Sequence, residues 1–253
     1  MAVTLITGAS SGLGYGLAPY MAADGDTVIL TARRLESLQQ LADQIREKGG
    51  KAVPIALDVT DAAAVRAAVA AIERDHGPVD TLIANAGIGA DTSALRWRSE
   101  DLERVYRTNV FGVSHCIEAV LPGMIARRQG HLVAVASLAG YRGLPASGAY
   151  ASSKAAVISL MESLRVELRG HGVRVTTLSP GFVKTELTAK NRFPMPFLME
   201  LDDAARLMHR AIRRQRSEYR FPWTLASVIT LARFLPNRLW DYLLRNRKVM
   251  KAE

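Results

Sequence analysis

The sequence predicts a doubly wound α/β fold, in which helices cover both faces of one parallel sheet. Short apolar runs alternate with helical segments along most of the chain, and the joins between them are short and contain glycine. The runs are rich in Val, Ile, Leu and Thr and mostly lack polar alternation, which is typical of strands buried on both faces. Because crossovers between parallel strands are right-handed, six such β–α repeats predict one sheet of about seven strands with helices on both sides.

The apolar runs and the helical patterns between them define the elements in order. Strands are predicted at residues 2–7, 26–32, 51–57, 79–85, 130–137 and 172–179, with a short one near 218–221. Helices are predicted at residues 13–23, 35–48, 61–75, 100–127 and 150–169, with a further one near 202–215. A chain of 253 residues is near the upper limit for a single core, so these elements are expected to form one domain.

The last part of the chain departs from this pattern. Residues 186–201 carry two prolines among several large apolar groups, which predicts a mobile substrate flap rather than a regular element. Residues 222–253 predict two short basic amphipathic helices separated at Pro236. We therefore expect an α/β domain over residues 1–221 and a helical C-terminal extension over 222–253.

Charge and cysteine content limit the classes of function. The formal net charge is +9, and residues 204–253 alone hold 12 Lys+Arg against 3 Asp+Glu, so the rest of the chain is neutral. A nucleic-acid-binding protein more often spreads basic residues over a binding face, and no nucleic-acid partner is predicted. The single cysteine, Cys116, and the absence of a secretory signal favour a cytoplasmic protein.

A glycine-rich stretch, "TGASSGLG", joins the first strand to the first helix. Gly8, Gly12 and Gly14 allow a tight turn and a close approach of the backbone to a phosphate, and the helix N-terminus attracts negative charge. The spacing differs from the dinucleotide fingerprint G-x-G-x-x-G, and glycines alone could mark only a turn. Its place after the first strand of an α/β chain nevertheless predicts a dinucleotide cofactor. The contacts expected there come from Gly8, Ser10, Ser11, Gly12, Leu13 and Gly14.

The second strand ends in "TARR", where Arg33 and Arg34 stand in the place of the acid that NAD enzymes usually carry. A guanidinium group binds phosphate through paired hydrogen bonds, so two arginines favour NADP(H) over NAD(H). Arg33 is the better candidate. The alternative is that both arginines are solvated residues at the start of a helix.

Six motifs occur in a fixed order along the chain: "TGASSGLG" (7–14), "ANAG" (84–87), "TNVFG" (108–112), "VASLAG" (135–140), "YASSK" (150–154) and "SPGFVKT" (179–185). Together they resemble the short-chain dehydrogenase/reductase family over about residues 2–221, and Ala84 is one small departure, where the family often has Asn. The resemblance implies a Rossmann-type fold and hydride exchange between a nicotinamide and a carbonyl or alcohol carbon. It also implies a catalytic group of Asn109, Ser137, Tyr150 and Lys154.

The chemistry of Tyr150 and Lys154 supports that implication. A free tyrosine has a pKa near 10, and a nearby ammonium group is expected to lower it toward the working pH. The spacing of four residues places Lys154 on the same helix face as Tyr150. Ser137, at the end of the fifth strand, is expected to hold the substrate oxygen. In the family, the lysine also binds the nicotinamide ribose and the asparagine supports a proton-relay water.

The resemblance implies further cofactor contacts on the loops that follow the strands. Besides Tyr150 and Lys154, these are Asp58, Val59, Asn85, Ala86, Gly87, Pro180, Gly181, Val183 and Thr185. Two of them have a structural alternative: Asp58 could cap the helix that begins near Thr60, and Asn85 could only steady its turn.

The substrate is expected to meet Ser137, Tyr150, Leu138 and Leu144. Together with Tyr141, Ile88 and the apolar run 193–199, these residues predict an apolar wall and a lipophilic carbonyl or alcohol as substrate. The alternative is that the apolar residues pack against the protein or a partner subunit. The histidines are scattered without metal-ligand spacing, so no metal is predicted.

The resemblance implies a homodimer or homotetramer formed through helices 100–127 and 150–169. The apolar residues of the second helix that are expected to face outward are Val157, Leu160, Met161 and Leu164. The basic, aromatic C-terminal extension favours either peripheral membrane contact or packing on the body of the protein.

The sequence thus predicts an NADP(H)-dependent oxidoreductase with Tyr150 as its acid–base group. The alternatives are an NAD(H)-dependent alcohol dehydrogenase of the same fold and a non-catalytic nucleotide-sensing protein.

Overall fold

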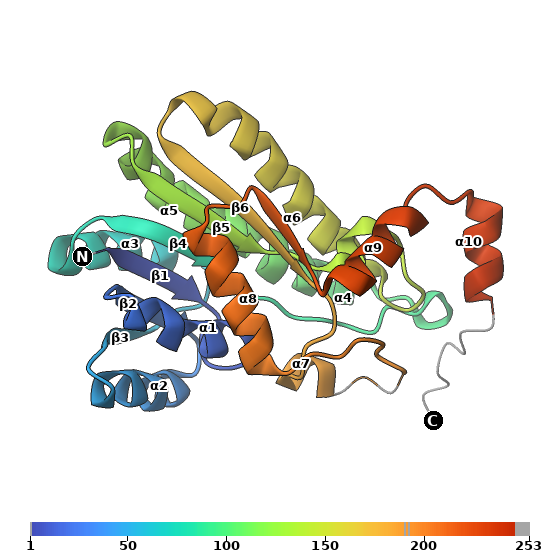
Figure 1. The fold of residues 1–253 in the computed structure, drawn as a ribbon, viewed down its shortest axis with the longest axis horizontal. Coiled ribbons are helices and arrows are strands. Elements are labelled where there is room, and N and C mark those ends of the chain that lie inside the picture. Colours follow the sequence, from blue (N-terminus) through green and yellow to red (C-terminus); the bar gives the residue numbers. More distant parts are fainter. Residues whose placement is uncertain (1, 190, 192, 246–253) are drawn as a thin grey trace.

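Seven parallel strands form one sheet in the order β3-β2-β1-β4-β5-β6-β7 (Figure 1). The computed structural model describes residues 2–189, 191 and 193–245. The strands are β1 (Val3–Thr7), β2 (Thr27–Ala32), β3 (Lys51–Ala56), β4 (Val79–Ala84), β5 (Gly130–Val135), β6 (Val173–Pro180) and β7 (Glu218–Phe221). This topology confirms the predicted doubly wound sheet.

Helices cover both faces of the sheet. The α-helices are α1 (Gly12–Ala23), α2 (Leu35–Glu47), α3 (Ala62–His76), α4 (Ser99–Tyr106), α5 (Gly112–Ala126), α6 (Gly148–Glu167), α7 (Glu186–Ala189), α8 (Leu201–Arg213), α9 (Trp223–Ala232) and α10 (Asn237–Leu244). Short 3-10 turns lie at Ala94–Arg96, Leu138–Tyr141 and Leu168–Gly170. One face of the sheet carries α1, α2 and α8, and the other carries α3, α5 and α6 (Figure 1).

The strands lack polar alternation because both of their faces are buried. In β1, Leu5 points into the core beneath α3, α5 and α6, whereas Ile6 points into the core beneath α1, α2 and α8. In β4, Leu82 likewise points into the core beneath α3, α5 and α6, and Ile83 points into the core on the other face. A side-chain period of two residues sends neighbours to opposite faces, so each position of a central strand needs an apolar residue.

The order of the strands reverses between β1 and β4, which are neighbours in the sheet. From this point the chain winds outward in both directions, so the helices that follow β1 and β4 lie on opposite faces of the sheet. Such a switch point is where open α/β sheets bind their ligands.

The predicted helix over 100–127 is confirmed as one helical run, Ser99–Ala126, but this run is not a regular α-helix throughout. A π turn, Arg107–Phe111, separates α4 from α5 and contains Asn109. A π turn adds one residue to the helical repeat and is frequent at functional sites. By length and composition, the run Ser99–Ala126 is also apolar enough to cross a membrane. In this fold, however, α5 packs against β4, β5 and α3, so the apolar side chains of this run belong to the core.

The prediction that the apolar face of α6 points outward is wrong. Val157 and Met161 are buried in the core against the sheet, and Leu160 and Leu164 are partly buried against the same core. The reason is that the apolar side of α6 is the side that covers the sheet.

The C-terminal segments lie beyond the last two strands of the sheet (Figure 1). Helices α9 and α10 lie on either side of Pro236, as the sequence predicts. Leu225 and Ala226 of α9 are buried against Leu138 and Tyr141, whereas no residue of α10 is buried. The predicted flap over residues 186–201 contains α7, and Met199 near its end forms an isolated bridge with Val183, which precedes the flap.

Candidate active site

The loop after β1 lies directly against the loop after β4. Gly8 has a φ of +67°, and a Cβ atom there would come within 2.7 Å of Ala86 Cα, so only glycine fits this turn. Thr7 Oγ1 accepts hydrogen bonds from the backbone N–H groups of Asn85 and Ala86, at 3.0 and 3.1 Å. Asn85 Nδ2 donates to the carbonyl oxygens of Thr7 and Gly8, at 2.9 and 3.1 Å. The Asn85 side chain therefore steadies the turn, which is the structural alternative for this residue.

The start of α1 suits a phosphate group. Ser11 occupies the N-cap position without a side-chain capping bond, and the first turn holds no acidic residue. Its N–H groups and the positive end of the helix dipole are therefore available to an anion. Gly14 leaves room for the turn, since a Cβ there would lie 2.5 Å from Asn85 Nδ2. Thr185 lies nearby, because its Cγ2 is 3.5 Å from where a Gly12 Cβ would be. These residues fit the pyrophosphate of a dinucleotide.

The two arginines after β2 differ in their partners. Arg34 donates to Glu186 Oε2 at 3.1 Å and to Ser10 Oγ at 3.3 Å. Arg33 is exposed and makes no hydrogen bond or ion pair with the residues that the structure describes. The guanidinium of Arg33 is thus free for an added phosphate, whereas Arg34 joins the glycine loop to the flap.

The remaining predicted cofactor contacts follow β3 and β6. Asp58 Oδ1 accepts from the backbone and the hydroxyl of Thr60, at 2.9 and 2.8 Å. Asp58 does not cap α3, because Asp61 takes that position. Val59 is buried beside Gly112, and Leu13 packs against the core on the other face of the sheet.

The segment after β6 runs back past the site. The Gly181 N–H donates to the Phe221 carbonyl at 2.7 Å, and Val183 is buried. Pro180 presents its carbonyl oxygen 3.4 Å from Ser137 Oγ. The chain after β6 is therefore fixed between β7 and the end of β5 before it reaches Thr185.

The buried Asn109 joins three segments of the site. Its Oδ1 accepts from the Ile88 N–H at 2.8 Å, and its Nδ2 donates to the Ile88 carbonyl and to Ser153 Oγ, each at 3.0 Å. Ser153 Oγ in turn donates to the Tyr150 carbonyl at 2.8 Å. The π turn that carries Asn109 is thus connected to the loop after β4 and to the first turns of α6.

Lys154 points from α6 toward the ends of the central strands. Its Nζ donates to the Val135 carbonyl at 2.8 Å and lies 5.8 Å from the centre of the Tyr150 ring. Gly87 borders this position, because a Cβ there would be 3.4 Å from both Lys154 Nζ and Asn109 Oδ1. Burial disfavours the charged ammonium and lowers the pKa of Lys154 to about 8.

The expectation that Lys154 lowers the pKa of Tyr150 is wrong for this structure. The pKa of the Tyr150 phenol is raised, because burial disfavours the phenolate, and a hydrogen bond with Ser137 opposes this only in part. The half-buried Tyr150 is therefore a neutral phenol at neutral pH, able to give a proton. Ser137 Oγ also accepts from the Ala139 N–H at 3.1 Å, which fixes the start of the next turn.

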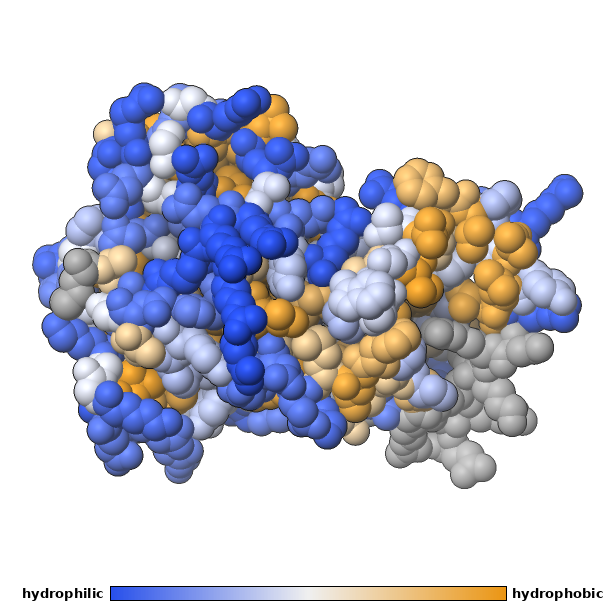
Figure 2. All heavy atoms as spheres, in the orientation of Figure 1, coloured by the Kyte–Doolittle hydropathy of each residue, from blue (hydrophilic) through white to orange (hydrophobic). Residues whose placement is uncertain are grey.

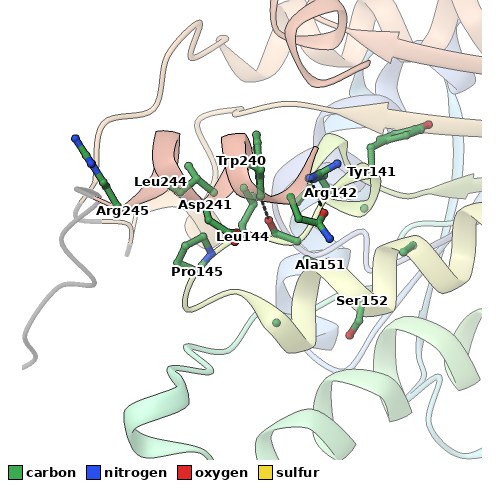
Figure 3. A pocket seen from close by; sticks show the side chains of 16 residues that line it. Tyr141, Arg142, Leu144, Pro145, Ala151, Ser152, Trp240, Asp241, Leu244 and Arg245 are labelled. Atoms are coloured by element: carbon green, nitrogen blue, oxygen red, sulfur yellow. Dashed lines mark hydrogen bonds between the residues drawn. The ribbon is translucent and has the colours of Figure 1, made fainter. Parts of the chain in front are cut away.

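Leu138 and Tyr141 pack against the protein, which was the alternative to lining a substrate site. Leu138 is buried against α9, and the Tyr141 hydroxyl bonds to Ser179 and Glu218. Leu144 instead lines a cavity of about 790 Å³ between the loop after Ser137, α6 and α10 (Figure 3). Exposed apolar side chains of the flap include Phe193, Phe197 and Leu198.

Two residues of the site carry no signal strong enough to be singled out from the sequence. Ser153 is one of several small residues in α6, yet it connects Asn109 to Tyr150. Gly140 lies against the backbone of α6, since a Cβ there would come within 2.8 Å of the Lys154 carbonyl carbon. Gly140 therefore permits the loop after Ser137 to approach Lys154.

Comparison with known proteins identifies the family of this chain. The family model for short chain dehydrogenases matches residues 2–195. An uncharacterized oxidoreductase from Myxococcus xanthus is 50% identical over 237 residues, covering 94% of each chain. A short chain dehydrogenase/reductase from Burkholderia phymatum, solved in complex with NAD, has a TM-score of 0.84 and 27% identity, covering 100% of this chain and 98% of that one. A short-chain dehydrogenase from Sphingobium yanoikuyae, solved with NADPH, gives a TM-score of 0.82 and 25% identity, covering 100% and 99%.

The chain therefore belongs to the short-chain dehydrogenase/reductase family. It is an NAD(P)-dependent oxidoreductase that uses a nicotinamide cofactor, which confirms the predicted class of enzyme. Members of this family act on small-molecule substrates and form oligomers.

Replacing Ser153 by alanine tests the connection between Asn109 and Tyr150. Loss of one buried hydrogen bond costs about 1 kcal/mol, so we expect kcat to fall about fivefold for Ser153→Ala while NADPH affinity stays unchanged. Steady-state kinetics and a fluorescence titration with NADPH measure the two quantities. Ser159→Ala, on the exposed side of the same helix, is the control. Equal kcat values for the two variants would contradict the positioning role of Ser153.

The pKa values predict how carbonyl reduction depends on pH. The phenol of Tyr150 stays protonated over the neutral range because its pKa is raised, whereas Lys154 loses its proton as the pH rises through about 8. If the ammonium is required, kcat/KM is constant at lower pH and falls about tenfold per unit above this pKa. A profile of kcat/KM measured from pH 6 to pH 10 tests this, and we expect its bend at about pH 8. The Lys154→Met variant should have a low kcat/KM and a profile without the bend. A wild-type profile without the bend would refute the requirement for the Lys154 ammonium.

Proposed function

We propose that the protein is an NADP(H)-dependent reductase of lipophilic carbonyl compounds. The observation that carries the cofactor preference is the free guanidinium of Arg33, exposed at the end of β2 where "TARR" offers no acid. An extra phosphate on the adenosine ribose would meet this cation, whereas a ribose with two free hydroxyls would find no carboxylate there.

The bound nicotinamide supplies or accepts the hydride at the substrate carbon. In the proposed mechanism, Ser137 Oγ binds the carbonyl oxygen and Tyr150 donates its phenolic proton to the same oxygen. The buried Lys154 ammonium, 5.8 Å from the Tyr150 ring centre, stabilises the phenolate that forms. Asn109 acts through Ile88 and Ser153 and positions the loop after β4 and α6. In the oxidation of an alcohol, Tyr150 would take up the proton.

The proposed cofactor site runs along the carboxyl ends of the strands. Its residues are those that the resemblance implies on the glycine loop, after β2, β3, β4 and β6, and in α6. We propose that Asn85 contributes through its backbone, since its side-chain amide is bound to the glycine loop. We propose that the Thr185 hydroxyl, which bonds to Thr188 at 3.3 Å in this structure, exchanges this partner for the carboxamide.

The apolar surroundings of the site support a lipophilic substrate. Phe193, Phe197 and Leu198 of the flap are exposed, and Leu144 faces a cavity beside α6. Exposed aromatic and aliphatic side chains on the segment after β6 favour an apolar ligand, although the cavity lined by Leu144 does not include Ser137 or Tyr150. The flap also contains α7, whose Glu186 is paired with Arg34, so closure of the flap and binding of the cofactor are coupled in this proposal.

The proposal includes the assembly and the location of the protein. We propose a homodimer or homotetramer in the cytoplasm, with residues 1–221 as the catalytic domain and residues 222–253 as a basic helical extension. The extension gives the protein a peripheral contact with membranes. Its residues 246–253 lie outside the described residues, so the helices α9 and α10 carry this part of the proposal.

Cofactor consumption over a panel of ketones tests the function. NADPH-dependent reduction should increase from small polar ketones to long-chain and steroid ketones, and NADH should serve poorly. Arg33→Ala should lower the affinity for NADPH about tenfold to a hundredfold and leave that for NADH unchanged. Arg66→Ala, which removes an exposed arginine of α3, is the control. Equal use of NADPH and NADH by the wild type, or unchanged NADPH affinity in Arg33→Ala, would contradict the assignment.

A further inference from the structure

An exposed apolar surface covers the outer sides of α9 and α10, and we call it the C-terminal apolar face. Its members are 43–80% exposed: Trp223, Val228, Leu231, Phe234, Leu239, Tyr242 and Leu243. Figure 2 shows hydrophobic residues gathered at this end of the molecule, where Figure 1 places α9 and α10. Soluble monomers rarely expose so many large apolar side chains together, so such a surface marks an interaction site.

The surface is formed by the apolar helix α9 and the amphipathic helix α10. Trp223, Leu231 and Phe234 follow one another at helical spacing along the outer side of α9 and just beyond it, whereas Leu225 and Ala226 are buried on the inner side. The inner side of α9 thus binds the domain, and its outer side has no apolar partner among the described residues. Helix α10 has no buried residue, and its Tyr242 and Leu243 are exposed.

Basic residues surround this apolar face. Arg233 and Arg238 are exposed and form no ion pair with a described residue, and Arg245 lies 3.8 Å from the centre of the Tyr242 ring. Asp241 is the single acidic residue between Pro222 and Arg245 in the sequence. The charge next to the apolar face is therefore positive, as is typical of helices that lie in an anionic membrane interface.

A second copy of the chain fits this surface less well than a membrane does. In a two-fold symmetric contact each subunit presents the same patch, so two positively charged patches would face one another across the interface. Like charges opposed in this way cost binding free energy. Lipid phosphates, in contrast, complement the arginines while the acyl region accepts the apolar side chains.

From this combination we propose that the C-terminal apolar face docks on an anionic lipid bilayer, with Trp223, Leu231, Phe234, Tyr242 and Leu243 in the interface and Arg233, Arg238 and Arg245 on lipid phosphates. Docking of this kind deepens the proposed function, on which its biological purpose rests, because it would bring the enzyme to lipophilic substrates.

The docking helices are connected to the segment that follows Ser137. Arg142 donates to the Arg233 carbonyl at 3.0 Å and to Asn237 Oδ1 at 3.2 Å, and its guanidinium lies 5.1 Å from the centre of the Trp240 ring. Trp240 Nε1 donates to the Gly143 carbonyl at 3.2 Å (Figure 3). The cavity lined by Leu144 lies between this connection and α6. The bilayer would therefore contact helices that are fixed to the loop beside the catalytic serine.

Vesicle flotation of the full-length protein tests the docking. With vesicles of phosphatidylcholine and phosphatidylglycerol, we expect wild type to float, and recovery to fall at least about fivefold with pure phosphatidylcholine or in Leu231→Ser/Phe234→Ser. Arg233→Gln/Arg238→Gln should lose the preference for anionic lipid. Val166→Ser, which changes an exposed apolar residue of α6, is the control and should float as wild type does. Wild type that stays in the dense fraction, or equal loss in the control, would overturn the proposal.

Two further readouts separate the alternatives. If light scattering shows that Leu231→Ser/Phe234→Ser splits an oligomer and wild type does not float, the face is a contact between copies and the proposal is overturned. NADPH consumption with a water-soluble ketone, measured on the same samples, should be unchanged in all of these variants. Flotation without turnover of any carbonyl would support the docking while contradicting the proposed substrate class, so the two failures are distinguishable.

Discussion

The hydrogen bonds of one buried side chain, Asn109, hold the candidate active site together. Its amide oxygen accepts from Ile88, and its amide nitrogen donates to Ile88 and Ser153. Ser153 in turn donates to the Tyr150 carbonyl. A buried amide without partners costs about 1–3 kcal/mol, so the segments that satisfy it are held in one arrangement. The π turn is what directs Asn109 inward from an otherwise regular helical run. The positions of Tyr150, of the loop after β4 and of the nearby Lys154 therefore depend on a single buried amide.

Burial then sets the protonation states within that arrangement. Removal from water raises the pKa of Tyr150 and lowers that of Lys154, so both side chains shift toward their neutral forms. A protonated phenol is the form that gives a proton to a carbonyl oxygen, as the proposed reduction requires. The Val135 carbonyl holds the Lys154 ammonium at the end of β5, two residues before Ser137 in the chain. The end of β5 and helix α6 thus position Tyr150 and Lys154, and burial sets their protonation states.

The sequence predicted the parts of the fold and of the site that follow from local pattern. Unbroken apolar runs identify strands of a doubly buried sheet, and the glycine loop and motif order identify the family. The π turn could not be predicted, because the apolar pattern of 100–127 continues through it. The helix face of Val157 and Met161 was misassigned, since spacing alone does not tell which side of α6 meets the sheet. Ser153 and the contact between Arg142 and Trp240 depend on tertiary packing, and the pKa shifts depend on burial depth, which the sequence does not contain.

We propose that Tyr150 transfers the proton at a site assembled by Asn109. The most direct measurement is single-turnover reduction of a lipophilic ketone by pre-bound NADPH, comparing wild type with Tyr150→Phe. We expect the rate to fall about 10²–10⁴-fold while the dissociation constant of NADPH changes less than about twofold, because the phenolic oxygen acts on the substrate. A variant that keeps the wild-type rate would show that another group supplies the proton, and the catalytic assignment would be wrong.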